Sequence, residues 1–148
     1  MIDPFGLDDI AETAVTIRDT TPPVVTLASD PLALLWPPNH RIRCLTAADL
    51  ALTAVDACSD AVAWRFVDCR SDQPDDGLGD GHHAPDCFAS DDGGSLCVRS
   101  ERQGGVPEGR RYTVVAEALD PCGNSTGPVL SGEIHVVHDQ RSPSSRSR

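Results

Sequence analysis

The residues most suggestive of chemistry are acidic side chains crowded into the middle of the chain. Eight of the 18 aspartates fall between Asp68 and Asp92. Calcium takes six to eight oxygen ligands, often from Asp-rich loops, and glycines let such a loop fold tightly. We therefore predict a structural calcium ion in this loop, with four carboxylate ligands: Asp72, Asp76, Asp80 and Asp86.

The same loop could also hold its shape without a cation. Asp side chains accept hydrogen bonds from nearby backbone N–H groups in turns, and runs of charge usually face solvent. The loop does not match an EF-hand. Counted from Asp75, positions 3 and 5 are Gly77 and Gly79, and position 12 is Asp86 in place of Glu. A loop satisfied by its own backbone and by water is therefore the alternative to a calcium site.

The six cysteines form an even set without the spacing of a zinc site. They are Cys44, Cys58, Cys69, Cys87, Cys97 and Cys122. Three disulfides in an oxidising compartment fit this set better than free cytosolic thiols do. The first 15 residues have no basic region and no apolar stretch, so they do not form a signal peptide. Either a signal was removed or the chain is a piece of a longer secreted protein. We favour the piece, and so an extracellular or cell-surface location.

No catalytic motif is evident in the sequence. It has no GxSxG elbow, no HExxH motif and no nucleotide-binding glycine loop. His82 and His83 are adjacent, so on an extended segment they point to opposite sides, and we expect surface histidines rather than zinc ligands. The net charge of −11 argues against nucleic acid as a partner. No apolar run is long enough to span a membrane, so we expect no membrane insertion.

The pattern of apolar residues predicts short strands joined by turns. The 148 residues include 12 Gly and 12 Pro, and no segment sustains a helical period. Apolar residues alternate most clearly over residues 62–67 and again from Tyr112 to Ala118. About seven such strands, with a long Asp/Gly-rich loop over residues 70–94, predict an all-β antiparallel sandwich.

The chain divides into one domain with short ends. A length of 148 residues fits a single domain. Residues 1–18 are polar and form a lead-in or the last strand of a preceding module, and residues 19–140 form the module itself. Residues 141–148 are rich in Ser and Arg, which predicts a disordered tail.

Several sequence blocks occur in an order that resembles a known family. They are DTTPPV at 19–24, LWPPNH at 35–40, GDG and APD within 79–86, RSER at 99–102 and DPCGN at 120–124. With these blocks the chain resembles the immunoglobulin-like repeat modules of large secreted bacterial proteins, which are related in style to hyalin repeats. LWPPNH and GDG…APD are the specific blocks. The resemblance implies a non-catalytic immunoglobulin-like sandwich of about seven strands, with Trp64 and Tyr112 on facing core strands.

The resemblance also implies a disulfide. In an immunoglobulin-like sandwich, the loops after the second and sixth strands share one end of the domain, which favours Cys58–Cys122. Three arrangements then remain for the other four cysteines. Of these we prefer Cys87–Cys97, across a Gly-rich turn, together with Cys44–Cys69.

The predicted function is that of a non-catalytic structural or adhesive module in a multidomain secreted or cell-surface bacterial protein, disulfide-bonded and calcium-stabilised. Its partners would be neighbouring modules or a surface protein or glycan ligand. The alternative is a carbohydrate-binding accessory module of a secreted hydrolase. That function requires a row of exposed aromatic rings, and the chain has only two Trp, one Tyr and three Phe. A small metalloenzyme is a third class, which His82 and His83 alone cannot support.

Overall fold

The protein is all-β in the computed structural model, which describes residues 11–26, 31–77 and 83–138. Those residues form nine strands and no helix, which confirms the predicted class with more strands than the seven expected. The strands are β1 (Val24–Thr26), β2 (Ala33–Leu35), β3 (Ile42–Thr46), β4 (Thr53–Val55), β5 (Ala63–Ser71), β6 (Cys87–Ala89), β7 (Ser95–Arg99), β8 (Arg110–Leu119) and β9 (Val129–Val136). Within the described ranges, no helix is long and apolar enough to cross a membrane.

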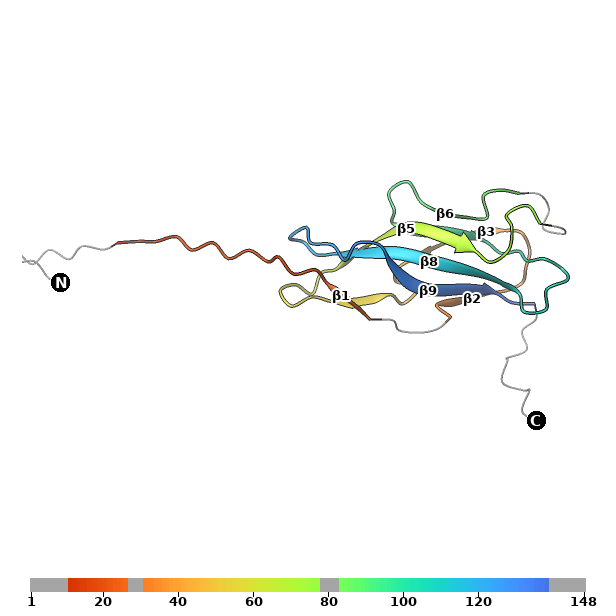
Figure 1. Cartoon of the computed structure of the whole chain (residues 1–148), viewed down its shortest axis with the longest axis horizontal. Coiled ribbons are helices and arrows are strands. Elements are labelled where there is room, and N and C mark those ends of the chain that lie inside the picture. Colours follow the sequence, from red (N-terminus) through yellow and green to blue (C-terminus); the bar gives the residue numbers. More distant parts are fainter. Residues whose placement is uncertain (1–10, 27–30, 78–82, 139–148) are drawn as a thin grey trace, which may run out of the picture.

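The strands form two larger sheets and a short ribbon (Figure 1). One sheet has the order β2-β9-β8-β5, and the other has the order β3-β7-β6. β1 and β4 pair with each other. Neighbouring strands are antiparallel except β2 and β9, which run parallel. The two larger sheets contribute to one apolar core and so form an antiparallel sandwich.

The core is built by alternation along the strands. Tyr112, Val114 and Ala116 on β8 are fully buried, as the sequence pattern predicts for one face of a strand. Leu96 and Val98 on β7 enter the same core from the other sheet. Both sheets therefore bury an apolar face against each other, and this burial is the main contribution to the stability of the fold.

The predicted placement of Trp64 and Tyr112 on facing strands is wrong. β5 and β8 are neighbours in one sheet, where Trp64 lies opposite Ala118 and Ser71 lies opposite Tyr112. Trp64 is only partly buried, and Phe66 is the aromatic residue of β5 that the core covers, with 3% of its surface exposed.

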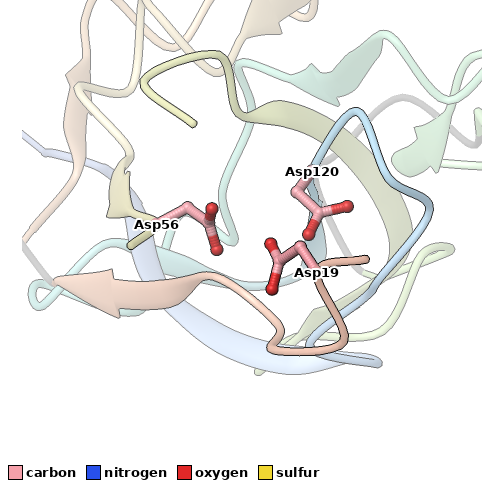
Figure 2. Close-up of side chains that lie close together, drawn as sticks. All are labelled: Asp19, Asp56 and Asp120. Atoms are coloured by element: carbon pink, nitrogen blue, oxygen red, sulfur yellow. The ribbon is translucent and has the colours of Figure 1, made fainter. Parts of the chain in front are cut away.

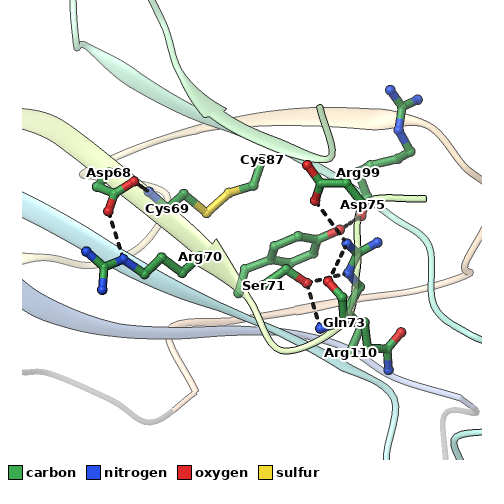
Figure 3. Close-up of a disulfide and its surroundings, with 10 residues drawn as sticks. Asp68, Cys69, Arg70, Ser71, Gln73, Asp75, Cys87, Arg99 and Arg110 are labelled. Carbon is green, nitrogen blue, oxygen red and sulfur yellow. Dashed lines mark hydrogen bonds and ion pairs between the residues drawn. A yellow bond between two sulfur atoms is a disulfide. The ribbon is translucent and has the colours of Figure 1, made fainter. Parts of the chain in front are cut away.

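Two disulfides link strands of the sandwich, one within a sheet and one between the two larger sheets. Cys44 on β3 and Cys97 on β7 lie directly opposite each other in the ladder, with their Cα atoms 3.9 Å apart. Cys69 and Cys87 connect β5 to β6, the edge strands of the two larger sheets, across a Cα separation of 5.9 Å (Figure 3). Such bridges indicate folding in an oxidising compartment.

The predicted Cys87–Cys97 bridge is wrong because of the register of the β6–β7 hairpin. Cys87 lies opposite Val98, and Cys97 lies opposite Phe88. Side chains alternate between the two faces of a sheet, so Cys87 and Cys97 point to opposite faces.

The predicted Cys44–Cys69 bridge is also wrong, because Cys44 is bonded to Cys97 and Cys69 is bonded to Cys87. Cys58 and Cys122, which the family resemblance pairs, are exposed free thiols in the structure.

The Asp/Gly-rich loop is shorter than predicted. β5 continues to Ser71 and β6 begins at Cys87, so the loop spans residues 72–86 instead of 70–94. Within it, residues 78–82 lie outside the described part of the chain.

A buried ion-pair cluster anchors this loop to the sandwich. Arg110, at the start of β8, is 1% exposed, and its Nη1 lies 2.7 Å from Asp86 Oδ2 and 3.1 Å from Glu101 Oε1. Its Nη2 donates a hydrogen bond of 3.3 Å to the carbonyl oxygen of Gln73 (Figure 3). It donates another of 3.3 Å to the carbonyl oxygen of Pro74. One guanidinium thus pairs with two buried carboxyl groups and donates hydrogen bonds to two carbonyl oxygens in the first turn of the loop.

Glu101 makes the stability of this cluster dependent on pH. Burial, reinforced by the Asp86 carboxyl, raises the pKa of Glu101 to about 7 from 4.5, against the opposing effects of His40 and Arg110. Arg99 also faces it, at 3.8 Å. Because the folded pKa is the higher one, folding takes up a proton between these two values. The Glu101 contribution is therefore most favourable below pH 4.5 and is lost as the pH rises through 7.

We expect Glu101→Gln to raise the free energy of unfolding at about pH 8 by about 1–3 kcal/mol and to change it little near pH 5. Urea unfolding at both pH values measures the effect. Glu133→Gln is the control, because Glu133 is partly exposed and pairs with His135. Equal effects of Glu101→Gln at the two pH values would contradict the assignment.

Candidate functional site

Three aspartates from distant parts of the chain meet at one end of the sandwich (Figure 2). Asp19 ends the N-terminal segment, Asp56 follows β4, and Asp120 follows β8. One carboxylate oxygen from each lies within 4.8 Å of the other two. We call these three residues the aspartate trio. Figure 2 shows their carboxylates turned toward one another.

Local turns hold each member of the trio in place. Asp19 Oδ1 accepts a 3.0 Å hydrogen bond from the backbone N–H of Thr21, just before two prolines. Asp56 Oδ1 accepts hydrogen bonds from the backbone N–H groups of Cys58 at 2.9 Å and Ser59 at 3.0 Å. Short loops that use Asp to cap their own backbone therefore set the direction of these two side chains.

Asn124 connects Asp120 to Asp19. Its Nδ2 donates to Asp120 Oδ2 at 2.7 Å and to the backbone carbonyl of Asp19 at 3.3 Å. Its backbone N–H donates to Asp120 Oδ1 at 2.8 Å. The DPCGN turn thus positions Asp120 and also holds the N-terminal segment against the sandwich.

The trio carries negative charge that no basic side chain in the described part of the chain neutralises. No arginine or histidine in the described ranges forms an ion pair with Asp19, Asp56 or Asp120. Asp56 Oδ2 is buried and has no hydrogen-bond partner among the described residues. Buried polar atoms are nearly always satisfied, so this oxygen is an acceptor that a cation or a water molecule could use.

The geometry and donor type of the trio fit calcium. Calcium binds oxygen at about 2.3–2.6 Å, so two of its ligands can lie about 5 Å apart. The oxygens of the trio lie within 4.8 Å of one another, and one ion can therefore contact all three. Carboxylate oxygens are the ligands that hard cations prefer.

Two groups at the site have shifted pKa values. Burial raises the pKa of Asp120, but the hydrogen bonds from Asn124, Cys122 and Gly123 outweigh it and the net pKa is lowered. The negative charge of Asp19 raises the pKa of the Cys58 thiol, and burial and Asp56 raise it further. The site therefore holds Asp120 ionised and keeps the adjacent thiol protonated.

Two of the predicted calcium ligands have other partners in the structure. Asp86 is buried and forms ion pairs with Arg110 at 2.7 Å and Arg99 at 3.1 Å, so it is an internal counter-ion. Asp72 is exposed, and its Oδ1 accepts a hydrogen bond from the backbone N–H of Arg111.

The other two predicted ligands add no site in the described residues. Asp76 is exposed, and Asp80 lies outside the described ranges. Among the described residues, Asp72, Asp76 and Asp86 do not form a group of converging ligand atoms. Within the described residues, no ligand group thus combines Asp72, Asp76 and Asp86, and the part that depends on Asp80 stays a prediction.

A repeated motif in the sequence could have revealed the trio. Asp56-Ala57-Cys58 and Asp120-Pro121-Cys122 share the pattern Asp-x-Cys, each directly after a strand. The argument that brings the two cysteines to one end of a sandwich applies equally to the two aspartates. Asp19 had no such signal, because only the folded structure brings the N-terminal segment to these loops.

No protein-family model, curated protein or solved structure matches this chain. The fold and the trio therefore carry the functional argument.

Proposed function

We propose that this chain is a non-catalytic structural or adhesive module of an extracellular multidomain protein, and that calcium bound by the aspartate trio fastens its N-terminal segment to the sandwich. In the family that the sequence resembles, such modules follow one another along a secreted or cell-surface bacterial protein. A cation at the start of the module would stiffen the connection to whatever precedes it.

The proposal rests on which segments of the chain supply the three carboxylates. Asp19 belongs to the N-terminal segment, whereas Asp56 and Asp120 belong to loops of the sandwich. Residues 11–18 extend away from the sandwich as an arm, and β9 ends at the opposite end (Figure 1). A cation shared by the trio would fix the arm at its base, where a change of direction would reorient a neighbouring module.

The distribution of exposed aromatic rings favours this function over a carbohydrate-binding module. Among the described residues, the large exposed aromatics are Trp36, 45% exposed, and Phe88, 37% exposed. Trp36 follows β2 in one sheet, and Phe88 lies on β6 in the other. A sugar chain needs a row of rings on one surface, so this arrangement supports a structural role.

We expect calcium to raise the melting temperature of the wild-type protein. At a free concentration about tenfold above a Kd of about 10⁻⁴ M, binding adds about 1.4 kcal/mol, or about 3–5 °C for a domain of this size. Asp56→Asn should abolish the shift while keeping the Oδ1 acceptor for Cys58 and Ser59. In chelator this variant should be at least as stable as wild type, because one of three repelling charges is gone.

The matched control is Asp72→Asn, the same substitution at an exposed aspartate that accepts a backbone hydrogen bond outside the trio. It should retain the full calcium shift. A shift that survives Asp56→Asn but is lost in Asp72→Asn would move the ion to the Asp/Gly-rich loop and contradict the proposal.

Limited trypsin digestion tests the fastening of the arm. Arg18 is the only basic residue between residues 11 and 23, and it directly precedes Asp19. Calcium should slow cleavage after Arg18 several-fold and leave cleavage after the exposed Arg41, which directly precedes β3, unchanged. Equal protection at both arginines would indicate general stabilisation instead of a fastened arm.

A further inference from the structure

We propose that Cys58 and Cys122 form a third disulfide, which braces the two loops that carry Asp56 and Asp120 and tightens calcium binding by the trio. This inference rests on the proposed function for its calcium component. The bridge itself stands on the arrangement of the two loops.

The two cysteines occupy equivalent positions beside the trio. Each follows its aspartate by two residues, and each donates its own backbone N–H to that aspartate's carboxylate. The Asp56 and Asp120 carboxylates in turn lie within 4.8 Å of each other. The two Asp-x-Cys turns therefore face each other across the site. In both turns the cysteine comes two residues after the aspartate.

The accessibility of the two thiols also favours a bridge. Both are exposed and unpaired in the structure. The other four cysteines are already paired within the sandwich. In an oxidising compartment, two accessible thiols on facing loops have no other partner in the described part of the chain than each other.

The reaction is a thiol–disulfide exchange with an external disulfide, such as oxidised glutathione. One cysteine attacks the oxidant as its thiolate and forms a mixed disulfide, releasing one molecule of thiol. The second cysteine then attacks the mixed disulfide at the protein sulfur, forming the Cys58–Cys122 bond and releasing a second molecule of thiol. The two protein thiols are oxidised by two electrons, and the two protons they lose appear on the released thiols.

The bridge would affect the trio by pre-organisation. A cation must hold Asp56 and Asp120 together against their mutual repulsion. A covalent bond two residues from each carboxylate restricts the two loops before the ion binds. Binding then costs less conformational entropy. We expect calcium to bind about 3–10-fold more tightly to the oxidised protein than to the protein without this bridge.

The experiment uses the full chain produced by secretion into an oxidising medium. Non-reducing peptide mapping should recover the peptides containing Cys58 and Cys122 linked to each other. Calcium titration should then give a Kd about 3–10-fold higher for Cys58→Ser/Cys122→Ser than for wild type. The double substitution leaves Cys44–Cys97 and Cys69–Cys87 in place, and the melting temperature in chelator checks that it still folds.

The outcomes separate the bridge from the calcium site. Free thiols at both positions, or a link from either cysteine to another one, would overturn the bridge. A confirmed bridge with the same calcium Kd in both proteins would contradict the claim that the bridge tightens calcium binding. If wild type binds no calcium, the proposed function fails and the brace fails with it, whereas the mapping still decides whether the bridge exists.

Discussion

Replacing Arg110 with Met should lower the free energy of unfolding by about 3–5 kcal/mol at about pH 8. Arg110 is the shared cation of Asp86 and Glu101, and all three side chains are fully buried. Met matches the length of the aliphatic stem but leaves two carboxylates buried without that cation. Urea unfolding with the disulfides intact measures the loss.

A surface ion pair provides the control for this substitution. Arg70→Met removes the partner of Asp68, and the Arg70 side chain is 78% exposed, so we expect a loss of less than about 1 kcal/mol. Adding Asp86→Asn and Glu101→Gln to Arg110→Met should recover part of the stability, because the stranded charges are then gone. A loss below about 1 kcal/mol for Arg110→Met would show that the cluster does not depend on its cation.

Removal of the Cys44–Cys97 disulfide is expected to cost about 4 kcal/mol, and removal of Cys69–Cys87 about 3 kcal/mol. The two bridges close separations of 53 and 18 residues, respectively. In the chain-entropy model, the longer loop restricts the unfolded chain more, so its removal frees more conformations. Paired Cys→Ala substitutions in each bridge and denaturant unfolding provide the comparison.

The order of the two losses is the informative result. A larger loss for Cys69–Cys87 would mean that its link between the edges of the two sheets contributes native-state stability beyond the restriction of the unfolded chain. It would contradict the entropic account for these two bridges.

Alternation of apolar residues made the fold class predictable from the sequence. Tyr112, Val114 and Ala116 follow a period of two and are fully buried on β8. Pairing between strands could not be read in the same way. The register that sets Cys87 opposite Val98 depends on the short hairpin between β6 and β7, and sequence spacing across a Gly-rich turn does not fix it.

The sequence indicated the type of ligand in the candidate site, carboxylate oxygens, but not which aspartates provide them. The density of Asp pointed to carboxylates that converge in the Asp/Gly-rich loop, and the part of that prediction that depends on Asp80 stays a prediction. The described residues bring carboxylates together at Asp19, Asp56 and Asp120. Asp86 forms an ion pair with Arg110. Arg110 lies 24 positions later, and the sequence alone does not indicate that the two residues pair. The trio forms because the fold brings three distant segments of the chain together. Residue spacing within a single segment does not reveal it.

Isothermal titration calorimetry with calcium, on the full chain in its oxidised state, tests the central claim most directly. We predict one calcium ion per chain for wild type and for Asp72→Asn, and no binding for Asp56→Asn, whose fold is checked by its melting temperature in chelator. Absence of binding to the wild-type protein at millimolar calcium, or unchanged binding to Asp56→Asn, would contradict the assignment of the aspartate trio as a calcium site.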